Sequence, residues 1–143
     1  MLQVIIFTIQ KGWCQSLKIQ ESAENYLETI LMLQKQKGAV RSIDIVNALS
    51  FSKPSVSVAM KNLRENGYIE MGADGFIHLM PSGLAIAEKI YERHTLLSHW
   101  LVALGVAPDV AAQDACRMEH VVSAESFEAI KRHVEETGHA GEL

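Results

Sequence analysis

The sequence predicts a mainly α-helical protein with a small β-hairpin wing, in which an N-terminal winged helix-turn-helix precedes a second, helical domain. Three observations lead to this fold class. Two short helical segments are separated by a tight turn, a hairpin pattern follows them directly, and apolar residues then recur at helical spacing. At 143 residues the chain is long enough to bury such a core without disulfides.

The helix-turn-helix is predicted from three helices. Apolar residues at three- and four-residue spacing predict the first helix over Glu21–Lys37. A shorter helix over Ser42–Leu49 follows, with Ser42 as its N-cap. The third helix begins at Pro54, a residue favoured in the first helical turn, and runs to about Asn66.

Spacing also predicts which side chains of these helices face the core. The stripe predicted for the short helix is Ile43, Val46 and Leu49, with Ile45 on a second apolar face. The inward positions predicted for the third helix are Val56, Met60 and Leu63.

A β-hairpin is predicted directly after the third helix. Tyr68–Met71 and Phe76–Leu79 are β-prone segments, and the residues that join them include Asp74-Gly75, a strong hairpin signal. A helix-turn-helix followed by a hairpin is a winged helix. Residues 21–80 are therefore predicted to form a winged helix-turn-helix DNA-binding domain.

Three further helices are predicted over Pro81–Leu104, Pro108–Val121 and Ser123–Thr137, so residues 81–143 form a helical domain. Residues 1–20 are predicted to be an N-terminal extension, whose order the sequence leaves open. The apolar run at its start, Leu2–Ile9, is too short to cross a bilayer and lacks the features of a signal peptide, so no membrane partner is expected.

Charge is unevenly distributed along the chain. The net charge is −4, yet the segment Lys35–Arg64 carries six basic residues against Asp44, a local balance of +5. A local basic face attracts phosphates even on an acidic protein, so this segment is compatible with nucleic-acid binding. The only cysteines, Cys14 and Cys116, make no disulfide framework, which favours reduced thiols and a cytoplasmic location.

Three potential metal ligands recur at helical spacing near the C-terminus. Cys116, Glu119 and His120 occupy positions i, i+3 and i+4, so a helix places their thiolate, carboxylate and imidazole on one face. Such a face is half of a transition-metal site. Taken singly, each residue has a commoner structural explanation, such as a cysteine buried in the core.

Several motifs together resemble a known family. The run Ser22–Ile30, the winged helix, Arg93-His94 and Ala115–His120 occur in this order in the metal-dependent repressors typified by the diphtheria toxin repressor and the manganese transport regulator. The resemblance covers residues 22 to 137, and Cys-Arg-x-Glu-His is its most specific element. It implies a short, two-domain transcriptional repressor of metal-ion homeostasis that forms a homodimer through a helical dimerisation domain, residues 81–143.

The resemblance also implies a ligand set for a divalent transition metal. The positions that match the family's metal ligands are Glu28, His94, Cys116, Glu119 and His120. Asn25 stands where the family usually has methionine or aspartate; its amide can coordinate but adds neither charge nor sulfur. The Cys116 thiolate favours Fe(II) over Mn(II), with Zn(II), Co(II) or Ni(II) able to bind in vitro.

Double-stranded DNA is the expected partner of the third helix. The residues on or just before its outward face that can contact phosphates or base edges are Ser52, Lys53, Pro54, Ser55, Ser57 and Lys61. Lys37 and Arg41 are expected to contact the DNA backbone. An ion held by both domains would set the spacing of two recognition helices across a palindromic operator, about 34 to 36 Å.

Two other functional classes are open. A winged-helix regulator could sense oxidants through Cys116 without metal, which predicts loss of DNA binding after peroxide and indifference to chelators. The other class is a metalloenzyme or thiol enzyme using Cys116 and His120. The sequence has no glycine-rich phosphate loop and no oxyanion-hole turn, so an enzyme is not expected.

Overall fold

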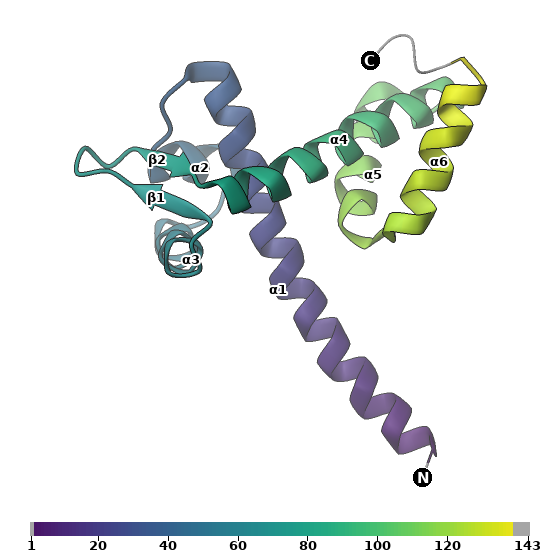
Figure 1. Cartoon of the computed structure of the whole chain (residues 1–143), viewed down its shortest axis with the longest axis horizontal. Helices are drawn as coiled ribbons and strands as arrows, with labels where there is room; N and C mark the ends of the chain where they lie inside the picture. Colours follow the sequence, from purple (N-terminus) through teal and green to yellow (C-terminus); the bar gives the residue numbers. More distant parts are fainter. Residues whose placement is uncertain (1, 139–143) are drawn as a thin grey trace. The chain divides into compact units, whose positions relative to one another are not determined.

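The computed structural model describes the backbone of residues 2–138 and the side chains of residues 20–138. The elements in chain order are α1 (Leu2–Lys37), α2 (Ser42–Leu49), α3 (Lys53–Glu65), β1 (Ile69–Met71), β2 (Ile77–Leu79), α4 (Pro81–Ala103), α5 (Pro108–Val121) and α6 (Ala124–Glu136) (Figure 1). This order confirms the predicted fold class. The chain forms two compact units, Met1–Ala87 and Glu88–Leu143. No helix in the described part of the chain is both long and apolar enough to span a membrane.

In the first unit, α2, α3 and the hairpin pack against the C-terminal part of α1. Burying these apolar side chains is the main favourable contribution to the stability of the unit. The most deeply buried of them are Leu27, Ile30, Val40, Ile45, Val56, Met60, Ile69 and Ile77.

The first two helices differ from prediction at their N-terminal ends. α1 begins at Leu2 rather than Glu21; no proline precedes Glu21 to block a helical path. For α2 the predicted N-cap, Ser42, is wrong by one residue because Arg41 takes that position, and the Arg41 N–H donates to Asp44 Oδ2 at 2.8 Å.

The predicted stripe of α2 is also wrong in part. Ile43 is exposed, whereas Ile45 is fully buried, and α2 packs against both α1 and α3. The helix has eight residues, about two turns, and carries apolar residues on more than one side. Periodicity alone therefore does not decide which side packs, and the position of the neighbouring helices does.

α3 and the hairpin follow the predictions closely. Ser52 caps α3 by accepting the Ser55 N–H at 3.2 Å, and the three predicted inward residues are buried. In the hairpin, Glu70 pairs with His78. Gly75 closes the turn with a φ of 80°, a conformation that glycine adopts without strain.

One glycine at the start of α4 allows two backbone segments to approach closely. A Cβ atom at Gly83 would lie 2.1 Å from the carbonyl oxygen of Tyr68, the residue just before β1. That oxygen also accepts the Met80 N–H at 2.9 Å. The first turn of α4 is thus held against the base of the hairpin in a contact that only glycine permits.

The second unit contains most of α4 together with α5 and α6. Its core joins Leu96, Leu97, Ala115 and Phe127, with Trp100 and Met118 among the partly buried residues around it. Ser123 caps α6 by accepting the Ser126 N–H at 3.1 Å. An ion pair between Lys131 Nζ and Glu92 Oε1 at 2.6 Å links α6 to α4, and the hydrogen bond from this pair raises the pKa of Lys131.

Candidate metal centre and nucleic-acid interface

The second unit holds a fully buried carboxylate between two imidazoles. Glu119, in α5, is 0% exposed, and its Oε2 lies 2.8 Å from His94 Nδ1 of α4. Its Oε1 lies 3.3 Å from His120 Nε2 without forming a hydrogen bond to any residue that the structure describes. A buried carboxylate oxygen without a donor is costly, so this arrangement fits a group that brings positive charge.

The hydrogen bond from His94 determines which of its ring nitrogens can act as a ligand. An ionised carboxylate can only accept, so with Glu119 ionised the Nδ1 of His94 carries the hydrogen. The Nε2 of His94 then keeps its lone pair. A histidine oriented by a carboxylate in this way is the usual form of a metal-ligating imidazole.

Arg93 fixes the end of α5 on which Glu119 and His120 lie. One guanidinium nitrogen donates to the carbonyl oxygens of Glu119 at 3.0 Å and Val122 at 2.7 Å. The guanidinium also lies over the Phe127 ring, 5.2 Å from its centroid. These contacts satisfy carbonyl groups that a helix leaves open at its C-terminus. No local sequence pattern assigns Arg93 a role of its own, because its hydrogen bonds join residues far apart in the chain.

The other predicted ligands have different environments. Cys116 lies one turn before Glu119 and His120 on α5 and is exposed, unlike Glu119. In the first unit, Glu28 is buried in α1 and Asn25 is half-buried one turn earlier. The Asn25 backbone oxygen accepts a hydrogen bond from the Thr29 hydroxyl at 2.8 Å. This bond does not involve the side-chain amide of Asn25.

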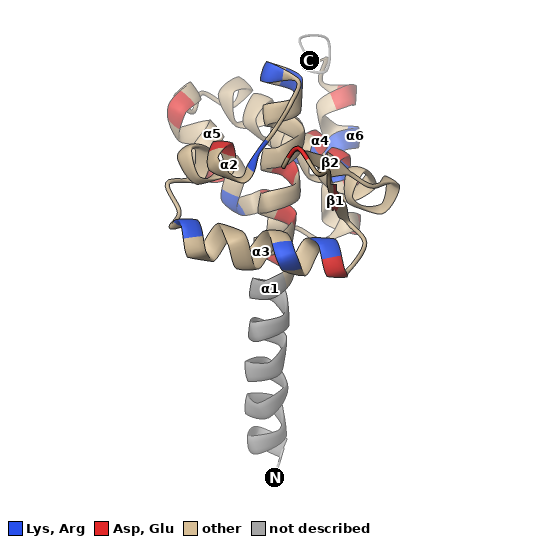
Figure 2. Cartoon of the chain, turned by 90° about the vertical axis from the view of Figure 1, so that its left-hand side faces the viewer, with Lys and Arg blue, Asp and Glu red and all other residues tan. Residues whose placement is uncertain are grey.

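The predicted DNA-binding residues all lie at the surface of the first unit. Figure 2 shows basic residues along α3. Every predicted position is exposed: Lys37, Arg41, Ser52, Lys53, Pro54, Ser55, Ser57 and Lys61. Exposure of the whole set is what a DNA-contacting face requires.

Two of these positions also make contacts within the protein. Lys37 Nζ lies 2.6 Å from Asp44 Oδ1, and the hydrogen bond from Lys37 is the main cause that lowers the pKa of Asp44. The Arg41 guanidinium lies 4.4 Å from the centroid of the Phe76 ring, beside β2. Part of the positive charge of Lys37 is therefore already compensated.

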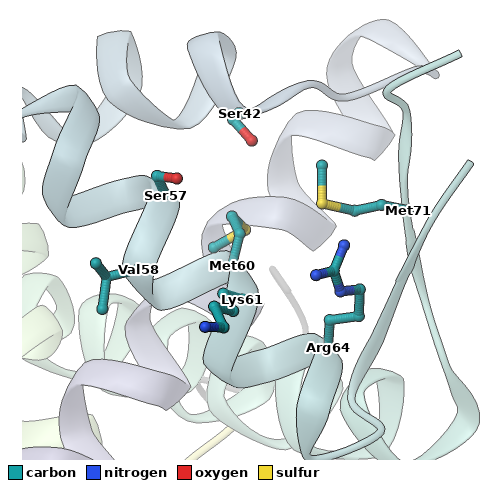
Figure 3. Close-up of a pocket in the computed structure, with 7 residues that line it drawn as sticks. All are labelled: Ser42, Ser57, Val58, Met60, Lys61, Arg64 and Met71. Carbon is teal, nitrogen blue, oxygen red and sulfur yellow. The ribbon is translucent and has the colours of Figure 1, made fainter. Parts of the chain in front are cut away.

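A cleft of about 330 Å³ is lined by residues of α3, by Ser42 of α2 and by Met71 of β1 (Figure 3). Its lining brings two cationic side chains, Lys61 and Arg64, close to the hydroxyl-bearing residues Ser42 and Ser57. Arg64 and Ser42 were absent from the residues predicted to contact DNA. The basic run that contains Arg64 was a signal that could have found it.

Two family models match this chain. The N-terminal DNA-binding domain of iron-dependent repressors matches residues 18–75, and their metal-binding and dimerisation domain matches residues 80–140. The transcriptional regulator MntR of Salmonella typhimurium is 33% identical over 123 residues, which cover 86% of this chain and 78% of that protein. The chain belongs to the iron-dependent repressor family.

Two further proteins are similar to most of this chain. The HTH-type transcriptional regulator MntR of Geobacillus kaustophilus is 31% identical over 109 residues, 76% of this chain and 77% of that protein. A solved manganese-dependent transcriptional repressor in complex with manganese is 27% identical, with a TM-score of 0.73 over 79% of this chain and 52% of that chain. This chain thus spans about half the length of that solved relative. The family consists of metal-dependent transcriptional regulators.

Proposed function

We propose that this chain is a homodimeric transcriptional repressor of metal-ion homeostasis, whose binding to a palindromic operator requires a divalent transition metal. Residues 21–80 would bind DNA and residues 81–143 would form the dimer. The observation that supports the proposal most is the buried Glu119 carboxylate, which lies between two imidazoles and has one oxygen without a donor among the described residues. It lies in the segment that matches a metal-binding and dimerisation domain.

The residues that would hold the metal come from both domains. They are Glu28, His94, Cys116, Glu119 and His120, to which Asn25 could add a weak amide oxygen. A bound divalent ion would supply positive charge that offsets the two carboxylates of this set. The ligands must be deprotonated to bind, so metal affinity should fall as the pH drops through the histidine range.

Coupling between the domains follows from where these residues lie in the chain. Glu28 belongs to the DNA-binding domain, and the four C-terminal ligands belong to the dimerisation domain. An ion bound by ligands from both domains would restrict the hinge between them. A larger fraction of the dimers would then hold both recognition helices at the spacing of the operator half-sites. A coupling of about 1 to 3 kcal/mol would tighten operator binding roughly 5- to 150-fold.

We further propose that Fe(II) is favoured over Mn(II) as the activating ion. The Cys116 thiolate is a soft ligand, and Mn(II) prefers oxygen and nitrogen, whereas Fe(II), Co(II), Ni(II) and Zn(II) accept sulfur more readily. Manganese remains the main competitor, because a solved relative is a manganese-dependent repressor. The exposure of Cys116 makes this residue accessible to direct substitution tests.

Replacing Cys116 with aspartate should move the metal preference towards manganese. A carboxylate at this position completes a harder ligand set, so the ratio of Mn(II) to Fe(II) affinity should rise about tenfold or more. Anaerobic metal titrations of the wild type and C116D would measure it. The Cys116→Ser variant is the matched control, since it removes sulfur without adding charge. An unchanged ratio in C116D would contradict a ligand role for Cys116.

The proposed function is tested by selecting operator DNA from random sequences. Selection would be run with the intact protein in chelator and, separately, in Fe(II), Mn(II) and Zn(II). The expected result is a sequence with two symmetric half-sites that is enriched only when metal is present. Enrichment of the same sequence in chelator, and its loss after peroxide, would instead support the metal-free oxidant sensor. Failure to enrich any sequence under any condition would overturn the proposal.

A further inference from the structure

One residue on the outward face of α3 does not fit the polar character of that face. Val58 is 60% exposed, whereas the other large apolar residues of α3, Val56, Met60 and Leu63, are buried. Valine is also a weaker helix former than most alternatives, so neither core packing nor helix propensity explains its presence. A single exposed apolar residue is common on protein surfaces. Its position within this face is what makes Val58 informative.

Val58 lies among side chains suited to contact DNA. It lines the same cleft as Ser57, Lys61 and Arg64, and Lys61 follows it by one helical turn (Figure 3). Hydroxyl and cationic groups can bind phosphates or polar base edges, but an isopropyl group cannot. An apolar group here needs an apolar feature on the ligand.

The major groove offers one such feature among the four standard bases. Thymine carries a 5-methyl group there, while the other bases present only hydrogen-bonding groups or a bare C–H. We infer that Val58 is a specificity-determining residue, which selects thymine at one position of each operator half-site by contact with its 5-methyl group. This inference rests on the proposed function, because it assumes that α3 enters the major groove.

A contact between Val58 and a thymine methyl group gives the recognition helix a means of base selection that its polar residues lack. Of the predicted contacts on α3, the serines are short and can donate to any suitable oxygen, and the lysines act mainly on phosphates. A methyl contact is weaker than a bidentate hydrogen bond. Burial of about one methyl group should favour thymine over a base without this group by roughly fourfold in affinity.

The test replaces each thymine of the selected operator, one at a time, with deoxyuridine, which lacks only the 5-methyl group. Affinity of the metal-loaded wild type should fall roughly fourfold at one position per half-site. In Val58→Ala this methyl preference should disappear. Val110→Ala, which shortens another exposed valine outside α3, should keep it. Lys61→Ala should weaken binding to all these duplexes about equally and also keep the preference.

The outcomes separate this inference from the proposed function. If the wild type binds its operator but tolerates deoxyuridine at every position, the methyl contact is wrong and the repressor function stands. The same holds if V58A keeps the methyl preference. If the wild type binds no operator under any metal, the proposed function itself fails. Circular dichroism of V58A should match that of the wild type, because the substitution lies at the surface.

Discussion

Replacing Glu119 with glutamine should weaken divalent-metal binding about 100-fold or more and abolish the effect of metal on DNA binding. Loss of groups that orient metal ligands costs 10- to 100-fold in affinity, and Glu119 would be a ligand as well as the hydrogen-bond partner of His94. Glutamine has almost the same shape as glutamate but cannot supply negative charge. Isothermal titration with Fe(II) and Mn(II), followed by operator binding, measures both effects.

The E119Q variant should remain a folded dimer. The amide of glutamine occupies almost the same buried volume as the carboxylate, so sedimentation should show the same oligomeric state as the wild type. Glu128→Gln on α6 is the matched control, because Glu128 is exposed and should not change metal affinity. Metal binding of wild-type strength in E119Q would contradict the assignment of the centre. Loss of the dimer would point to a structural role for Glu119 instead.

Replacing Gly83 with alanine should destabilise the first unit by about 3 kcal/mol. The added methyl group would lie 2.1 Å from the Tyr68 carbonyl oxygen, so either α4 or the base of the hairpin must shift. The backbone oxygen cannot rotate away as a flexible side chain could. Thermal unfolding of this unit should show a melting temperature about 12 °C or more below that of the wild type.

A neighbouring substitution separates this clash from a general effect at the helix start. Ser82→Ala removes an exposed hydroxyl that donates to the Gly67 carbonyl oxygen at 3.0 Å, and should cost no more than about 1 kcal/mol. If G83A is as stable as S82A, the close approach of α4 to Tyr68 is wrong. Because the hairpin belongs to the predicted DNA-binding domain, G83A should also weaken operator binding with metal present.

Local patterns were sufficient to predict most of the fold. The hairpin could be located because Asp74-Gly75 has a specific turn conformation, and the start of α3 could be located because proline favours the first helical turn. The side of α2 that packs could not be predicted. Ile43 and Ile45 are both apolar, and only the neighbouring helices determine that Ile45 is buried.

The candidate metal centre could be predicted only in part, because some of its features depend on the packing of one helix against another. Helix geometry alone places Cys116, Glu119 and His120 on one face, so their spacing in the sequence is enough to predict it. The burial of Glu119, its hydrogen bond to His94 and the support from Arg93 depend on how α4 packs against α5. These contacts join residues 25 or more positions apart, and no local pattern contains that information.

The central claim is that metal controls DNA binding through this centre. The most direct measurement is the operator affinity of the wild-type dimer, determined at one protein concentration in chelator and at saturating Fe(II) or Mn(II). We predict that metal tightens binding roughly 5- to 150-fold without changing the oligomeric state. Equal operator affinity in chelator and in every metal would contradict the claim.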